Sequence, residues 1–590
     1  MCMQQVCNRS GRSVRFCFFT ILSALLVITT VSCRKTSPPG GVAASMSSTA
    51  GLVSDQTLCH VEVSDLGKIV LQLAKSVQEV AATRPDSQQN FKTVVQFLQE
   101  KLGINPLLLD EYQKLGIDLT KPVGLSLLPN HGIEGLAGDE VHGAFHVAVT
   151  DPPKVVDLFN RLLVDEDVSL NKLDGNGGML YTVKDKRNDV MGLVFHHGYV
   201  SIILADVRDD DALRNYLPRF VAAAGKKNLQ ENKQYQRASE NVSSEGLARM
   251  FVNLQVAGDM FEEEVSESIP LLQEFLGLGV SLGAKEARAS LQMTTDSGLL
   301  KLIKPGASCQ DLLARAEAPM VGFSLSLADP LAVVEYVIRH VQGDAARGDR
   351  EVNDFKGNIE ELEVSYAQLR KSLTPASAAV LLYPEFIRSL FNLPEVIGVL
   401  KLQEQGVAQQ LLTLASEVGE KETRGQSTLY VIEPFIVGLI DGYVVAGTAM
   451  DKIRAIAADE AGSWKPFIGS SHLFAAELDA LAITQAVLAN QEMPQLVQLS
   501  VNSIMKKMMK SRAPLHLKTE RLKDGAAASL DLGSFQIDRH ILKLFAEPIH
   551  DMLEEMREEI EREQFRVPEP VGEDASAVDA EFELPLSNGS

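Results

Sequence analysis

Residues 323–341, Phe-Ser-Leu-Ser-Leu-Ala-Asp-Pro-Leu-Ala-Val-Val-Glu-Tyr-Val-Ile-Arg-His-Val, hold the pattern that decides the fold. Apolar side chains alternate at Phe323, Leu325 and Leu327, as in a strand with one buried face. Asp329 suits a helix N-cap, and Pro330 suits the first helical position because its missing N–H needs no partner there. The spacing of the next apolar residues predicts a helix with one buried stripe, formed by Val333, Val334, Val337, Ile338 and Val341.

The same strand–cap–helix unit occurs twice more. Alternating apolar residues at 59–63 precede Asp65, and those at 145–149 precede Asp151, with the same spacing as before Asp329. A stripe at helical spacing follows each aspartate, formed by Leu66, Ile69, Val70 and Val77 in one copy and by Val155, Val156, Phe159 and Leu163 in the other. Because only one face of each strand is apolar, the units predict two layers, with helices on one face of a sheet.

A second set of signatures indicates a repeat. The tripeptide Gly-Tyr-Val opens a predicted strand at 198–200 and again at 442–444, and the strands around Phe251 and Phe474 follow in the same order. We therefore predict an α+β protein in which 55–315 and 316–545 are diverged copies of one domain. The predicted sheet is largely antiparallel or mixed.

The N-terminus has the build of a bacterial export signal. Three arginines precede an apolar run of about sixteen residues, which is shorter than the roughly twenty that a spanning helix needs. The run ends in Thr30-Val31-Ser32-Cys33, which resembles a lipobox, although Thr30 stands where that motif prefers an aliphatic residue. The resemblance implies lipid attachment at Cys33 and a signal peptide over 1–33. An uncleaved membrane anchor and a secreted chain are the alternatives.

Segments of unusual composition flank the body. Residues 34–54 are rich in Ser, Gly, Pro and Ala and predict a flexible tether. Residues 546–590 predict the end of an amphipathic helix followed by an acidic, disordered tail.

Charge and cysteine content limit the partners. The formal net charge is −22, which argues against nucleic acid because phosphate binding needs clustered Lys and Arg. Only Cys59 and Cys309 lie in the predicted body, where they could pair or remain two inert thiols.

Two short segments resemble a large, often duplicated bacterial exported domain of unknown function. They are Leu-Gly-Ile-Asp-Leu-Thr-Lys-Pro-Val-Gly at 115–124 and Leu-Gln-Glu-Asn-Lys-Gln-Tyr at 229–235. The resemblance implies a protein of the cell envelope, facing the periplasm or the exterior, and it carries no catalytic signature.

No local catalytic, phosphate-binding or metal motif is found, so we assign no catalytic residue, metal or cofactor. The polar sides of the repeated strands would instead form an exposed binding face. We expect His196 and His197 to be solvated turn residues and Trp464 to anchor a loop. The residues of the expected face are His60, Glu62, His146, Ser324 and Ser326.

The functional prediction is a non-catalytic envelope lipoprotein. It would be held at the membrane by its lipid, and it would bind a protein, lipid or glycan through this face or through a cleft between the domains. A hydrolase whose active-site residues are scattered in sequence is the alternative, since triads are assembled by folding.

Overall fold

The computed structural model describes most of the body of the chain. The predicted signal peptide, Cys33, residues 34–47 of the tether and nearly all of 546–590 lie outside the described residues. The described residues are 48–67, 78, 85–129, 141–163, 169–173, 179–184, 189–204, 212–241, 247–260, 270–283, 286–341, 344–361, 365–387, 393–460, 462, 464–469, 472–479, 482–483, 514–531, 554 and 557–558.

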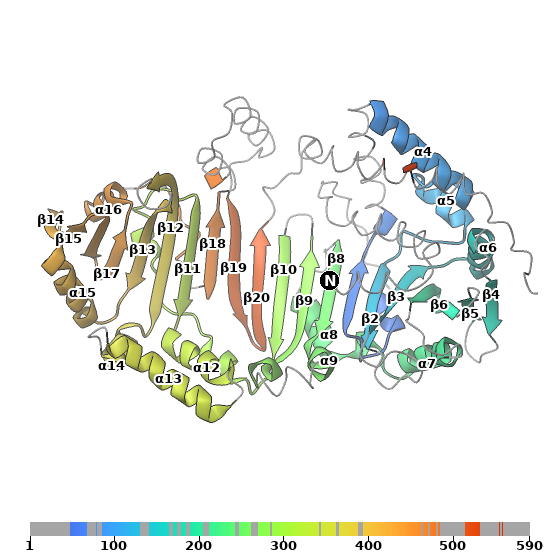
Figure 1. Cartoon of the computed structure of the whole chain (residues 1–590), viewed down its shortest axis with the longest axis horizontal. Helices are drawn as coiled ribbons and strands as arrows, with labels where there is room; N and C mark the ends of the chain where they lie inside the picture. Colours follow the sequence, from blue (N-terminus) through green and yellow to red (C-terminus); the bar gives the residue numbers. More distant parts are fainter. Residues whose placement is uncertain are drawn as a thin grey trace, which may run out of the picture.

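The molecule is α+β and is built on one twenty-stranded sheet that runs its whole length (Figure 1). Every pairing between its strands is antiparallel, which confirms the predicted class of sheet. The first ten strands are β1 (Cys59–Val63), β2 (Val123–Pro129), β3 (Val141–Ala148), β4 (Ser169–Leu173), β5 (Met179–Lys184), β6 (Asp189–His196), β7 (Tyr199–Leu204), β8 (Ala248–Asn253), β9 (Phe275–Leu282) and β10 (Glu286–Met293). Their order in space is β10–β9–β8–β1–β2–β3–β7–β6–β5–β4.

The second ten strands pair in the same order. They are β11 (Val321–Leu327), β12 (Ala376–Ile387), β13 (Leu393–Lys401), β14 (Glu420–Arg424), β15 (Ser427–Ile432), β16 (Phe435–Ile440), β17 (Tyr443–Gly447), β18 (Phe474–Leu478), β19 (Leu515–Leu522) and β20 (Gly525–Asp531). Their order is β20–β19–β18–β11–β12–β13–β17–β16–β15–β14. The two sets of ten join where β10 pairs with β20.

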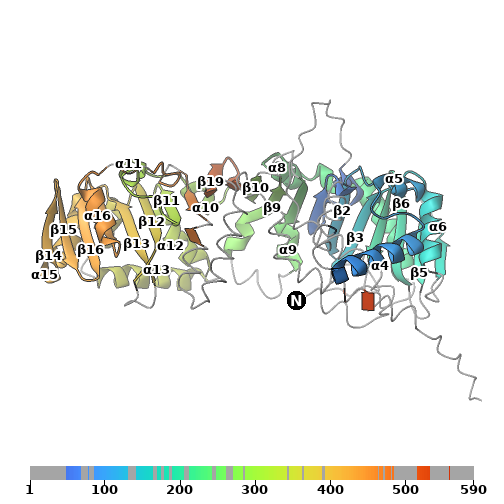
Figure 2. The same ribbon diagram turned by 90° about the horizontal axis from the view of Figure 1, so that it is seen from above.

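Helices cover both faces of the sheet at its two ends, so the two-layer prediction is wrong there. In β3, Phe145 and Val147 pack with Val155 of α6 (Pro152–Leu163), whereas Ala144 packs with Leu213 of α7 (Ala212–Lys226) on the opposite face. The other end has the same build, with α15 (Gln405–Val418) and α16 (Met450–Ala457) on opposite faces. Figure 2 shows helices gathered around both ends, with α8 (Lys233–Asn241) and α9 (Leu254–Met260) beside the strands of the middle.

The strand–cap–helix unit is present, but α12 (Pro330–Val341) does not lie on the sheet. The carboxylate of Asp329 accepts a hydrogen bond from the Ala332 amide at 3.0 Å, which confirms the predicted N-cap. Val334, predicted to be core, is 38% exposed, and Val341 is exposed as well. The helix packs mainly against α10 (Gly298–Leu302) and α13 (Ala345–Glu360). Val333 and Val337 of the predicted stripe do pack, in a cluster with Leu299 of α10 and Met293 at the end of β10.

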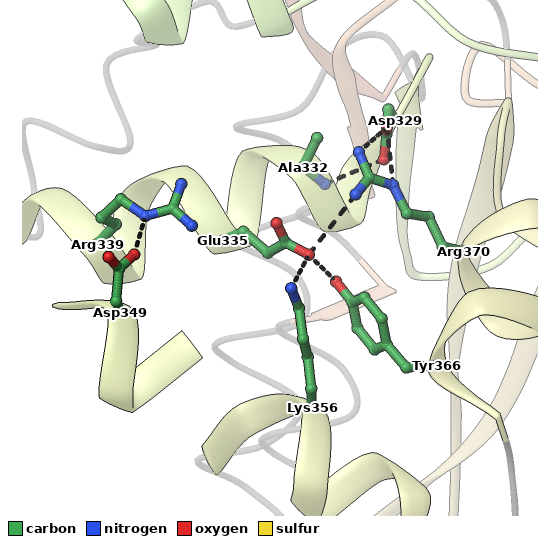
Figure 3. Close-up of polar contacts among 8 residues, drawn as sticks. All are labelled: Asp329, Ala332, Glu335, Arg339, Asp349, Lys356, Tyr366 and Arg370. Atoms are coloured by element: carbon green, nitrogen blue, oxygen red, sulfur yellow. Dashed lines mark hydrogen bonds and ion pairs between the residues drawn. The ribbon is translucent and has the colours of Figure 1, made fainter. Parts of the chain in front are cut away.

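Polar contacts tie α12 to α13 and to α14 (Tyr366–Ser372), as Figure 3 shows. Glu335 is buried and accepts a hydrogen bond from the Tyr366 hydroxyl at 2.5 Å, with the Lys356 ammonium at 3.2 Å. Burial acts to raise the pKa of Glu335, but these hydrogen bonds outweigh burial and hold the pKa below its ordinary value. Arg370 donates two hydrogen bonds to Asp329, at 3.2 and 2.8 Å.

Substitution of Asp329 separates the cap from the ion pair. Asp329→Ala removes both and should lower the free energy of unfolding by about 2 kcal/mol, of which about 1 kcal/mol is the cap. Asp329→Asn keeps an oxygen for the Ala332 amide and should lose only the ion-pair part, about 1 kcal/mol. Urea unfolding of both variants measures the difference, and equal losses would contradict the cap.

Two predicted boundaries are wrong. Ser48 caps η1 (Thr49–Leu52), and Ala50, Leu52 and Val53 are buried, so residues 48–54 of the predicted tether belong to the packed body. Cys309 and Leu313, assigned to the first domain, pack in the core of the second ten strands, together with Leu381 and Ile453. A cysteine pair is also ruled out, since Cys59 and Cys309 are both free.

Candidate functional site

All five residues of the predicted exposed binding face are buried. His60, Glu62, His146, Ser324 and Ser326 expose between 0 and 6% of their surface. They do share one side of the sheet, as the alternation of the strands predicts, but η1, α7 and α8 cover that side at the first half. The expectation of a solvated face is therefore wrong.

Glu62 holds the first residues of the body against the sheet. One carboxylate oxygen accepts hydrogen bonds from the Ser48 hydroxyl at 2.8 Å, the Thr49 amide at 2.7 Å and the Thr49 hydroxyl at 3.0 Å. Gly124 on the neighbouring strand makes room for this contact, because a Cβ there would lie 2.4 Å from the Thr49 hydroxyl oxygen. The backbone that leads in from the predicted tether is thus bound by a buried carboxylate.

A chain of hydrogen bonds continues from Thr49 across five strands. Its steps join alternating hydroxyl and imidazole groups: Thr49 Oγ1 to His60 Nε2 (3.2 Å), His60 Nδ1 to Ser126 Oγ (2.9 Å), Ser126 Oγ to His146 Nε2 (3.0 Å), His146 Nδ1 to Ser201 Oγ (2.8 Å) and Ser201 Oγ to His196 Nε2 (2.9 Å). The cross-strand register brings these residues together, since His60 faces Ser126 and His146 faces Ser201. We call this set the histidine chain.

The carboxylate at one end fixes the direction of every bond in the histidine chain. Thr49 donates its only hydroxyl proton to Glu62, so it accepts from His60 Nε2–H. A neutral His60 then accepts at Nδ1 from Ser126, which must accept from His146 Nε2–H. The same argument places the proton of His196 on Nε2. All three imidazoles are therefore Nε2–H tautomers that donate toward Glu62.

Burial keeps the histidines neutral near pH 7. Burial lowers the pKa of His60 to about 4, although the negative charge of Glu62 acts to raise it. Burial also lowers the pKa of His146 well below its ordinary value. Burial and the nearby His197 lower the pKa of His196 to about 4. His142, hydrogen-bonded to Tyr216 at 2.5 Å on the same side of the sheet, has its pKa lowered to about 4 by burial.

The two ends of the histidine chain differ in exposure. His196 ends β6 and is buried, whereas the adjacent His197 is exposed in the hairpin turn with φ = 51°. The prediction of two solvated turn histidines is thus right for His197 and wrong for His196. At the other end, Glu62 and His60 line a small pocket with Tyr235 and Arg249, which has room for little more than one water molecule.

Serine and histidine side chains meet here, but not as an open active site. Ser126 lies between two imidazoles in the manner of a nucleophile and its base, yet its own surface is fully buried. His60 and His146 approach to 6.4 Å between ring centres, through Ser126 and not through a shared ion. Among the described residues, no group of three His, Cys, Asp or Glu side chains is arranged to hold a metal.

The second ten strands carry different residues at these positions. Ser324 accepts a hydrogen bond from the Gly469 amide at 2.7 Å, and Ser326 accepts one from the Gly306 amide at 3.0 Å. Both serines therefore hold loops against the sheet. Trp464 donates to the buried Glu477 at 3.0 Å, which confirms it as a loop anchor.

Counting register from the first strand shows that the fold itself does not need histidines. The partner of Ser324 on β12 is Ala379, which faces Val399 and then Val445, all buried in an apolar core. In the first half the same row begins with His60 and Ser126. That row continues in the first half with Ala144 and Ile203, which are apolar as well, so the two halves differ where Ser324 and Ala379 replace His60 and Ser126. The second half thus builds the same pairing without the hydrogen bond that joins these two positions in the histidine chain.

The middle of the sheet has two contrasting sides. From Met250 on β8, directly opposed partners run through Val280, Ala289, Ala528, Thr519 and Phe474 to Leu325 on β11. The adjacent row on the other side runs through Arg249, Ser281, Arg288, Ser529, Lys518, Ala475 and Ser324. We call the side of the first row the apolar face.

Both sides of these central strands are partly accessible. On the polar side Ser281, Ser290, Gln292 and Glu477 are buried, whereas Arg249, Arg288, Ser529 and Lys518 are half-buried. The six residues from Met250 to Phe474 are only half-buried, and Leu325 is 44% exposed. A large apolar area left accessible marks an interaction surface. The sequence signal was present, in the alternation of β8, β10 and β18, but the alternation does not say which side will be covered.

Comparisons with known proteins add little. No family model and no curated protein matches the sequence. Two solved crystal forms of the protein TP0453 resemble part of the chain, with TM-scores of 0.22 and 0.19, sequence identities of 10% and 9%, and coverage of 43% and 41% of this chain and 81% and 79% of theirs. Similarity this low supports no conclusion about fold or function. In the part of the chain that the structure describes, no helix is long and apolar enough to cross a bilayer.

Proposed function

We propose that this chain is a lipid-anchored protein of the bacterial cell envelope that binds the acyl chains of a lipid on its apolar face. The observation that carries the proposal is the row from Met250 to Leu325, which crosses seven strands, is apolar except for Thr519 and stays partly accessible to solvent. Burial of an apolar ligand is favourable by roughly 25 cal/mol for each Å² removed from water.

The chemistry of the apolar face favours an acyl chain over a peptide or glycan. The row from Met250 to Leu325 contains no charged group, and its one hydroxyl, on Thr519, already donates to the Phe474 carbonyl at 3.3 Å. A glycan or peptide would leave its polar groups unpaired on such a surface. Neighbouring strands lie about 4.8 Å apart, so a row across seven strands spans roughly 29 Å, enough for an extended acyl chain.

The predicted anchor would keep the apolar face near its ligand. Fourteen residues lie between Cys33 and Ser48, and the fully extended chain from one to the other spans about 50 Å. The body is strongly acidic, with a chain net charge of −22, which opposes adsorption onto anionic lipid surfaces. This charge is therefore more compatible with a body that binds individual acyl chains than with a body that adsorbs flat onto the membrane surface.

A charged side chain on the apolar face should abolish lipid binding. Leu325→Glu places a carboxylate at an exposed position of the apolar face, where it would need to be desolvated by a bound acyl chain. We expect the dissociation constant for a fluorescent fatty acid to rise at least tenfold. Val418→Glu on α15 is the control, because Val418 is 72% exposed but lies away from these strands.

Two results would reject the proposal. Wild-type protein that takes up no fluorescent fatty acid or phospholipid has no such site. Equal affinities for wild type, Leu325→Glu and Val418→Glu would place any binding elsewhere. Thermal unfolding of both variants checks that they fold, and small effects are expected at these exposed positions.

The anchor itself is tested at Cys33. Cys33→Ser should leave an unprocessed chain that takes up no label from a fatty-acid probe in cells, because the serine cannot carry the thioether-linked lipid. A wild-type chain without label would remove the anchor from the proposal, whereas the apolar face would still be tested by ligand binding in solution.

We further infer that the two sets of ten strands are diverged copies of one domain. The support is the identical order of pairing and the shared hairpin turns, His197-Gly198 and Asp441-Gly442, which all have positive φ. The junction agrees, because Ala289 of β10 pairs directly with Ala528 of β20, and both residues open the same tripeptide, Ala-Ser-Leu, at 289–291 and 528–530. Duplication would double the length of the apolar face by joining two sheet edges.

A further inference from the structure

We propose that the histidine chain is a proton-relay path that takes up one proton beside the exposed His197 turn and delivers the added charge to the His60–Glu62 end. The inference rests on the unbroken hydrogen bonds between these ends and does not depend on the proposed lipid binding. Each link joins groups that both give and accept a proton, at 2.8 to 3.2 Å. Such a chain conducts protons by successive short transfers.

The transfer balances at every atom. The proton enters at His196 Nδ1, and His196 passes its Nε2 proton to Ser201, whose own proton moves to His146 Nδ1. His146 then gives its Nε2 proton to Ser126, and Ser126 gives its own to His60 Nδ1. His196 and His146 end neutral, each with its proton on Nδ1 in place of Nε2. The added charge rests on His60 or, after one more transfer through Thr49, on Glu62.

The surrounding charges draw the proton to the Glu62 end. Glu62 accepts a hydrogen bond from Thr49 at the end of the histidine chain, and a cation near this carboxylate gains Coulomb energy in a buried, weakly polar environment. The other titratable groups around the path are His197 in the hairpin turn, Tyr216 on α7, Tyr235 on α8 and Arg249 on β8. His197 and Arg249 lie outside the two ends, so a positive charge on either does not hold the proton in the middle.

The histidine chain is not explained by the needs of the fold. The second ten strands build the same order of pairing with Ser324, Ala379 and Lys401 at the register positions of His60, Ser126 and His146. Ala379 carries no polar group that could continue a hydrogen-bonded path, and Ser324 and Lys401 bind the backbone of loops instead, at the Gly469 amide and the Ser308 carbonyl. A fully connected polar path that the framework can do without points to a role in carrying protons.

Arrival of the proton should weaken the hydrogen bonds that hold Ser48 and Thr49 to Glu62. The Thr49 amide and hydroxyl and the Ser48 hydroxyl all donate to the same Glu62 oxygen. Hydrogen bonds to a charged acceptor are roughly twice as strong as those to a neutral one. Neutralising the charge at this end should therefore increase amide hydrogen exchange at Thr49 about tenfold, while the β1 amides stay protected.

The experiment follows the histidine tautomers by NMR in the full chain with ¹⁵N-labelled histidine, between pH 7.5 and 4. We expect the signals of His146 and His196 to change from Nε2–H to Nδ1–H at one common midpoint, with both rings neutral and with His60 changing at the same pH. Either ring becoming an imidazolium at its own midpoint would overturn the proposal. So would rings that keep their tautomers while His60 changes.

A single substitution tests the continuity of the path. Ser126→Ala removes the hydroxyl that joins His60 to His146, so His146 should no longer change at the same pH as His60. Ser324→Ala, at the corresponding register position of His60 in the second half, is the matched control and should leave all three signals as in wild type. Joint switching that survives in Ser126→Ala would overturn the relay.

Discussion

Lowering the pH from 7 to 5 is expected to destabilise the protein by on the order of 2 kcal/mol for each of three buried histidines. Burial lowers the pKa of His60, His142 and His196 to about 4, from an ordinary value near 6.5. Between these values the unfolded chain binds a proton at each imidazole and the folded chain does not. Acid therefore favours the unfolded state, and this loss is nearly complete at pH 4.

Urea unfolding measured at half-unit pH steps checks the expectation. His142→Gln keeps a side chain that can bond to the Tyr216 hydroxyl but removes one titrating group, so its stability should fall less steeply between pH 7 and 5. Tyr216→Phe is the control, because it removes the hydrogen bond and leaves the histidine in place. A wild-type stability that is flat over this range would contradict the burial of neutral imidazoles.

The sequence identified the right strands and the cap at Asp329, and it placed His60, Glu62 and His146 on one side of the sheet. The exposure of that side was wrong for a physical reason. Alternation tells which residues share a face, but whether water or another segment covers a face depends on contacts distant in sequence. In this protein Ser48 and Thr49, which read as part of a tether, supply the cover.

At the two ends of the sheet, the sequence could have predicted that helices cover the second face. In the middle it could not have predicted which face is covered. Strands β7 (Tyr-Val-Ser-Ile-Ile-Leu) and β16 (Phe-Ile-Val-Gly-Leu-Ile) are apolar almost throughout, which is typical of strands covered on both sides. No local sequence pattern indicated that β10 and β20 would pair and so join the two halves. The pairing of β10 with β20 brings together residues about 240 positions apart, and short, modestly apolar strands of Ala and Ser do not specify a partner.

The junction between the two halves should be the most sensitive place in the sheet. Gly525 begins β20 and faces Gln292 of β10. A Cβ at Gly525 would lie 2.0 Å from the Leu291 carbonyl oxygen, closer than any real contact allows. The obstacle is backbone, which cannot rotate aside, so Gly525→Ala must push β20 away from β10 and break hydrogen bonds between them.

Gly525→Ala is therefore expected to lower the free energy of unfolding by about 3 kcal/mol or more, through lost strand pairing and exposed backbone groups. Gly143→Ala on β3 is the matched control, since a Cβ there meets nothing within 4 Å and the added methyl should be neutral or slightly stabilising. Urea unfolding of the two variants gives the comparison. Equal stabilities would mean that β10 and β20 do not pair as described.

The same substitution connects the fold to the proposed function. The apolar face crosses the junction from Ala289 to Ala528, so a ligand that spans both halves needs β10 and β20 side by side. Gly525→Ala should then weaken fatty-acid binding without altering any side chain of the apolar face, and Gly143→Ala should not. Binding that survives a broken junction would confine the ligand to one half, on the Met250 or the Leu325 side. Loss of that remaining binding in Leu325→Glu would place the ligand on the Leu325 side, as the proposal requires.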